Sequence, residues 1–217
     1  FGCGLYADPN DITTTIDPDR VDVARNLLQS TNEILDYQVQ KRALSDAQRH
    51  KLIAVEAERL LKYVDPERVL PKDKWKYAEL LRATGRFEAA IPVYEEAVKK
   101  APDWDRRVND SLRLAQCYAK MGKVKEAIQL ARTTLAAPDT DTAPILPATL
   151  YELVPAAEGK GMDNELGKLL VDAIEAHRRT KVDLSTDAGK GFVAAGRFHI
   201  SRAQQKALVL LGQSNQL

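Results

Sequence analysis

Hydrophobic positions recur with a helical period along most of the chain. Apolar side chains three, four or seven residues apart form the stripe of an amphipathic helix that starts near Asp17 and Pro18 and continues to about Gln40. Ser45 and Gln48 have the spacing of a capping box, which predicts the start of a second helix. No segment alternates with period two for long enough to make a strand. The pattern therefore predicts an all-α fold.

The clearest feature of the sequence is a repeat organised around two glycines, Gly85 and Gly122. Matching residues, most of them small, aromatic or apolar, stand seven places before each glycine and two, five, nine and twelve places after it, and a proline follows seventeen places after the first glycine and sixteen after the second. The positions are Ala78, Phe87, Ala90, Tyr94, Ala97 and Pro102 in one copy, and Ala115, Val124, Ala127, Ala131 and Thr134 in the other, where Pro138 comes one place early. Small residues let two helices approach closely, and the glycine supplies the turn between them. Each copy is therefore predicted to be an antiparallel helix pair.

This pattern resembles the tetratricopeptide repeat, a unit of two helices and about 34 residues. Tyr118 supplies the first-helix tyrosine of the second copy, whereas Trp75 falls one place later than the family tryptophan. The resemblance implies a right-handed superhelical stack of antiparallel helix pairs, here with about ten helices. It also implies a non-catalytic scaffold that binds another protein.

The repeat divides the chain into four regions. Residues 1–17 form a polar tether, and residues 18–65 form a helical hairpin that is a divergent repeat or a cap. Residues 66–138 hold the two well-formed repeats. Residues 139–217 hold degenerate repeats and a C-terminal helix, with turns expected at Gly161 and Gly196 and a hinge expected at residues 139–144.

Charge and cysteine content narrow the functional classes. The chain has 32 basic and 31 acidic side chains, so its net charge gives no strong electrostatic attraction for nucleic acid. No apolar run approaches the length of a membrane span. Cys117 lies in a helical apolar pattern, which indicates a buried structural thiol.

Cys3 stands in a short motif that can be interpreted in more than one way. The segment Phe1-Gly2-Cys3-Gly4 resembles the end of a bacterial lipoprotein signal, which makes Cys3 a lipidation candidate. Acylation would place the protein at the bacterial cell envelope, lipid-anchored on the periplasmic side, and provide its only route to a membrane. The alternatives are an ordinary truncation or a bond to Cys117, and without the lipid the expected location is cytoplasmic.

The sequence offers no catalytic or cofactor motif. Gly189-Lys190-Gly191 lacks the first glycine and the Ser or Thr of a phosphate-binding loop, so a turn or a helix start is expected there. His50, His177 and His199 are far apart in the sequence and lack the close partners of a zinc site. We therefore expect no enzyme activity, no cofactor and no metal.

The family resemblance implies that the first helix of each repeat lines a concave groove for a protein or peptide partner. Helical spacing predicts eight groove residues: Lys72, Trp75, Lys76, Arg82, Leu112, Arg113, Tyr151 and Glu152. Trp75, Leu112 and Tyr151 each stand ten residues before a repeat glycine and could form an apolar row that anchors a peptide. The alternative is that they pack between helices. The groove changes from basic to acidic along the chain, which either orients a bipolar peptide or has no function.

Two functions remain open after these observations. The first is a scaffold that binds a peptide or protein segment in its groove, acting as an envelope-tethered assembly factor if Cys3 is acylated. The second is a structural subunit packed permanently in a larger complex. The identity of the partner does not follow from these residues.

Overall fold

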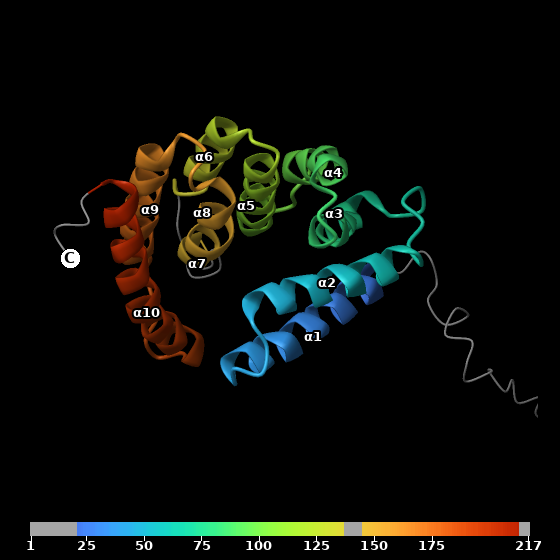
Figure 1. The fold of residues 1–217 in the computed structure, drawn as a ribbon, viewed down its shortest axis with the longest axis horizontal. Coiled ribbons are helices and arrows are strands. Elements are labelled where there is room, and N and C mark those ends of the chain that lie inside the picture. The colour runs from blue at the N-terminus through green and yellow to red at the C-terminus, as the bar shows by residue number, and fades with distance from the viewer. Residues whose placement is uncertain (1–20, 137–144, 213–217) are drawn as a thin grey trace, which may run out of the picture. The chain divides into compact units, whose positions relative to one another are not determined.

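The computed structural model describes residues 21–136 and 145–212. These residues form helices joined by short turns and contain no strand, so the all-α prediction is confirmed (Figure 1). The α-helices are α1 (Val21–Gln40), α2 (Asp46–Leu61), α3 (Lys74–Ala83), α4 (Phe87–Lys99), α5 (Trp104–Lys120), α6 (Val124–Thr133), α7 (Ile145–Ala148), α8 (Val154–Ala157), α9 (Asp163–Arg179) and α10 (Asp187–Leu210). A 3-10 turn, η2 (Pro71–Asp73), precedes α3, and a π-helical turn, η3 (Thr149–Leu153), joins α7 to α8. The tether, Cys3 and the expected hinge at residues 139–144 lie outside the described residues.

The chain forms two compact units, residues 1–89 and 90–217. In the first unit, α1 and α2 make an antiparallel hairpin, and both helices pack against α3. The predicted capping box starts α2, because the Gln48 N–H donates to the Ser45 hydroxyl at 3.2 Å and the Ser45 N–H donates to the Gln48 side chain at 2.9 Å. The core of this unit includes Ala24, Ala57 and Leu60, all fully buried.

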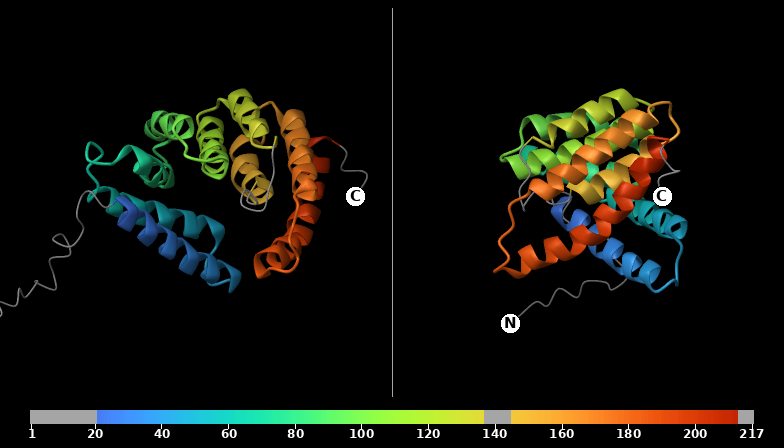
Figure 2. Two further views of the ribbon diagram at one scale, coloured as in Figure 1. Left: turned by 180° about the vertical axis from the view of Figure 1, so that it is seen from behind. Right: turned by 90° about the vertical axis from the view of Figure 1, so that its left-hand side faces the viewer.

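The second unit is built from neighbouring helix pairs. Helix α5 packs with α6, and α9 packs with α10, so that the two members of the last pair lie side by side in both views of Figure 2. The segment from α7 to α8 fills the space between these pairs and contacts both α5 and α9. Its three leucines and Val154 join one continuous core with α6, α9 and α10.

The repeat positions behave as the sequence predicted. Gly85 and Gly122 have φ values of +80° and +81° and turn the chain after α3 and α5, where a residue with a Cβ atom would be strained. The alanines of both copies are buried: Ala78, Ala90, Ala97, Ala115, Ala127 and Ala131. Tyr94 is completely buried as well. The α5–α6 pair confirms the prediction of a helix pair packed through small residues for the second copy.

Proline explains the π turn between α7 and α8. Pro155 has no N–H, so the carbonyl of Tyr151 lacks the donor that an α-helix would provide four residues later. The hydrogen-bonded turn contains one extra residue here. The Val154 N–H donates to the carbonyl of Thr149, five residues earlier, rather than to the carbonyl four residues earlier as in an α-helix. The Thr149 hydroxyl donates to the Ile145 carbonyl at 2.7 Å, which satisfies another carbonyl of the same segment.

The expected turn at Gly196 is wrong. Helix α10 continues through this residue from Asp187 to Leu210, so Gly196 is a helical residue. Its missing side chain serves a close approach instead, because a Cβ atom there would lie 2.4 Å from Nε2 of His177 on α9. Gly161, by contrast, has a φ of +83° and does turn the chain before α9, as predicted. The last predicted repeat is therefore a single long helix packed along α9.

Candidate functional site

One of the predicted groove residues, Trp75, faces the N-terminal hairpin in the first unit. The guanidinium of Arg25 on α1 lies 5.3 Å from the ring centroid of Trp75 on α3. The same Arg25 donates through Nε to Glu79 at 3.3 Å. Trp75 is partly exposed and contacts α1 through this cation–π interaction.

The basic residues of this helix are largely matched by neighbouring carboxylates. Lys76 pairs with Asp73 at 2.7 Å, and Arg82 lies 4.0 Å from Glu79. Lys72 is exposed on η2. The predicted basic character of the early groove is thus offset by acidic side chains of the same segment.

Leu112 and Arg113 lie on α5 in the second unit. Leu112 is only 6% exposed and belongs to the core, so it is not an exposed anchor, and the packing alternative holds for it. Arg113 lies 3.8 Å from Asp110, a buried carboxylate that also lies 3.7 Å from Arg106. These two basic side chains provide positive charge beside the buried acid.

Tyr151 differs from the other two predicted anchors because it is 42% exposed. It lies in the π turn, next to the exposed Glu152. Its ring meets the imidazole of His199 on α10 edge to face, with centroids 5.5 Å apart and an angle of 71°. The hydroxyl of Tyr151 lies 3.4 Å from Nδ1 of His199. The ring is therefore held in place while much of it remains open to solvent.

The ring of Phe198 on α10 extends this surface. It is 54% exposed and packs edge to face against His199 at 5.6 Å. The guanidinium of Arg202, one helical turn further on, lies 4.2 Å from the centre of the Phe198 ring, in a close cation–π contact. We call Tyr151, Phe198, His199 and Arg202 the aromatic patch. It presents two exposed rings and one fixed positive charge.

A second pair of rings connects α9 and α10. His177 stacks on Phe192 with centroids 4.2 Å apart and an angle of 18°. Burial lowers the pKa of His177, with His199 adding to the effect. Burial also lowers the pKa of His199, and the positive charge of Arg202 lowers it further. Both shifts favour the neutral imidazole.

The sequence did not indicate this cluster of rings. His177 and His199 stand 22 residues apart, and the fold brings them together by laying α10 along α9. One signal was present in the spacing, since Phe198 and Arg202 are four residues apart and share a helix face. Tyr151 is the only predicted groove residue that the described structure places in the patch.

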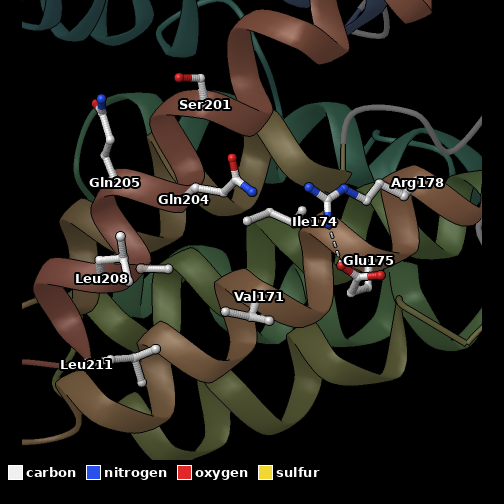
Figure 3. Close-up of a pocket in the computed structure, with 10 residues that line it drawn as sticks. Val171, Ile174, Glu175, Arg178, Ser201, Gln204, Gln205, Leu208 and Leu211 are labelled. Carbon is white, nitrogen blue, oxygen red and sulfur yellow. Dashed lines mark hydrogen bonds and ion pairs between the residues drawn. The ribbon is translucent and has the colours of Figure 1, made fainter. Parts of the chain in front are cut away.

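A groove of about 450 Å³ runs between α9 and α10. Figure 3 shows Val171 and Ile174 on one side and Leu208 and Leu211 on the other. Polar side chains at its rim are Ser201, Gln204 and Gln205, together with the ion pair of Glu175 and Arg178 at 2.8 Å. The groove is a concave surface of this helix pair with an apolar floor.

The described residues contain no cluster of three or more His, Cys, Asp or Glu side chains that could hold a metal ion. Within the same residues, no helix is both long and apolar enough to cross a membrane. Cys117 is completely buried in α5, as expected for a structural thiol. Gly189 and its neighbours form the first turn of α10, where the Gly189 N–H donates to the Thr186 hydroxyl at 3.0 Å, as a helix start requires.

Antiparallel helix pairs that pack through buried alanines define a helical-repeat protein. A comparison with protein families gives the same class, since the tetratricopeptide-repeat model matches residues 81–145, which span α4 to the start of α7. The comparison therefore assigns residues 81–145 to the tetratricopeptide-repeat family. No curated protein and no solved structure gives a significant match. Repeats of this family generally mediate protein–protein interaction, and the family is typically non-catalytic.

Proposed function

We propose that this protein is a non-catalytic scaffold that binds a segment of a partner protein, and that the aromatic patch is its contact surface. The observation that carries the proposal is the exposure of two ordered rings, 42% for Tyr151 and 54% for Phe198. Tyrosine and arginine are enriched among the residues that contribute most to binding at protein interfaces. The patch links these groups through His199, whose ring contacts both Tyr151 and Phe198.

The contacts that His199 and Arg202 make with the exposed rings lower the entropic cost of binding a partner. Immobilising a mobile side chain on binding costs about 0.5–1.5 kcal/mol. His199 and Arg202 already restrain Tyr151 and Phe198 in the unbound protein. A partner that covers these rings therefore gains apolar contact with a smaller entropic cost. Tyr151 is also one of the positions that the family resemblance places in the concave groove, so the proposal keeps a groove for the partner.

Site-specific cross-linking tests this function directly. A photoreactive phenylalanine analogue replaces Phe198 in the full chain, and the cross-linked partner is identified in the native source. The matched control carries the analogue at Val209, which is 50% exposed and lies 11 residues further along the same helix. We expect a specific adduct from position 198 that is lost when Tyr151→Ala is added. Equal cross-linking from both positions would refute the assignment of this surface.

Native size distinguishes the scaffold from a permanently assembled subunit. A scaffold is expected to be recovered partly as a free chain, whereas a structural subunit is recovered only in its complex.

Acylation of Cys3, with location at the bacterial envelope, is a separate proposal that rests on the motif around this residue. Mass spectrometry of the native protein should show a lipid adduct on an N-terminal cysteine, and a free Phe1 would overturn it.

A further inference from the structure

Positive charge gathers in the C-terminal part of the chain. Residues 176–217 contain seven Lys and Arg side chains but two Asp and Glu side chains, although the whole chain has a net charge of only +1. The basic residues are Arg178, Arg179, Lys181, Lys190, Arg197, Arg202 and Lys206. The rest of the chain is therefore acidic on balance, and the helix that carries the aromatic patch is basic.

Part of this charge is neutralised within the second unit. Lys190 pairs with Asp187 at 3.4 Å, and Lys206 pairs with Glu158. Arg197 and Arg202 form no ion pair with any described residue. Two exposed guanidinium groups on α10 are thus available to a partner, and one of them belongs to the aromatic patch.

The geometry of Arg202 indicates which chemical group it would bind. The central carbon of its guanidinium lies over the Phe198 ring, 4.2 Å from the ring centre. A cation–π contact uses the positive charge of the guanidinium and occupies none of its five N–H donors, which remain able to donate. A carboxylate matches this edge with two parallel hydrogen bonds, and pairs of this kind are among the stronger hydrogen bonds in proteins.

We propose that the aromatic patch recognises an acidic segment of a partner protein that carries an aromatic side chain. A carboxylate of the segment binds Arg202, and the aromatic ring packs against Tyr151 and Phe198. The inference rests on the proposed function and adds the chemistry of the partner. The protein interpretation is favoured over nucleic acid because a phosphate backbone is bound by several cations along its length, and α10 offers two that are not neutralised.

Binding of defined peptides to the full chain tests the inference. Three labelled peptides are compared by fluorescence anisotropy: a tryptophan flanked by aspartates, the same peptide with alanine in place of tryptophan, and the same peptide with lysines in place of the aspartates. We expect the acidic tryptophan peptide to bind most tightly. Arg202→Gln should weaken it roughly tenfold, as the loss of one charge-assisted contact predicts.

Arg197→Gln is the matched control, because it removes the same charge from the same helix outside the patch. We expect it to weaken binding less than twofold. Equal losses from both variants would show a general charge effect and overturn the inference. Tighter binding of a labelled thymidine oligonucleotide or of phosphatidylglycerol vesicles would overturn it too. If Phe198 cross-links a protein while Arg202→Gln has no effect, the chemistry of the partner is wrong and the scaffold function stands; if neither gives a signal, both fail.

Discussion

Replacing Gly196 by alanine sets two effects on α10 against each other. Alanine in the interior of a helix is favoured over glycine by about 1 kcal/mol. At this position, however, the new Cβ atom would lie 2.4 Å from Nε2 of His177. The imidazole cannot simply turn away, because it is stacked on Phe192 at 4.2 Å. Either the stack breaks or α9 and α10 move apart.

The magnitude follows from the cost of overpacking, which is about 1–3 kcal/mol for an extra methyl group in a well-packed contact. After the helix propensity is subtracted, Gly196→Ala should leave the free energy of unfolding unchanged or lower it by up to about 2 kcal/mol. Gly191→Ala lies in the same helix, and its Cβ atom would meet nothing within 4 Å. That variant should raise the free energy of unfolding by about 1 kcal/mol.

Thermal unfolding followed by circular dichroism measures the difference between the two variants. A separation of about 2 kcal/mol corresponds to roughly 4–8 °C for a protein of this size. The difference between the two variants does not depend on the exact helix propensity of alanine relative to glycine, because both substitutions are Gly to Ala in one helix. If Gly196→Ala is as stable as Gly191→Ala, then the close packing of His177 against α10 does not constrain the pair, and the reasoning is refuted.

Three further predictions concern local contacts. Ser45→Ala removes the capping box of α2 and should lower the free energy of unfolding by about 1 kcal/mol in denaturant titrations. Burial and the hydrogen bond to Glu95 raise the pKa of Tyr118 to about 12, above its ordinary value of 10.0, so stability should fall as pH rises from about 10 to about 12. Tyr118→Phe should flatten that fall, and an unchanged slope would contradict the assignment. The pKa of His199 is lowered, so NMR should show its imidazole titrating below pH 6.5, and Arg202→Gln should move that pKa back upward. No movement would show that Arg202 does not act on His199.

Local patterns determined the helical elements for a simple physical reason. A capping box, a glycine that turns the chain and a stripe of alanines all act within a few residues. Ser45, Gly85, Gly122 and Gly161 therefore start or separate helices where the sequence predicted. The same logic failed at Gly196, because a glycine can serve a turn or a close helix contact, and only the neighbour in space decides which.

The candidate site shows the complementary limit of the sequence. Trp75, Leu112 and Tyr151 share one offset from a repeat glycine, yet α1 contacts the first, the core buries the second, and the third stays exposed. Burial depends on which helix lies opposite each residue, and the spacing within one repeat holds no information about that neighbour. Phe198, His199 and Arg202 become part of the aromatic patch because the fold places Tyr151 in contact with His199. The sequence alone determined a tetratricopeptide-like helical protein, and tertiary packing decided which side chains remained available to a partner.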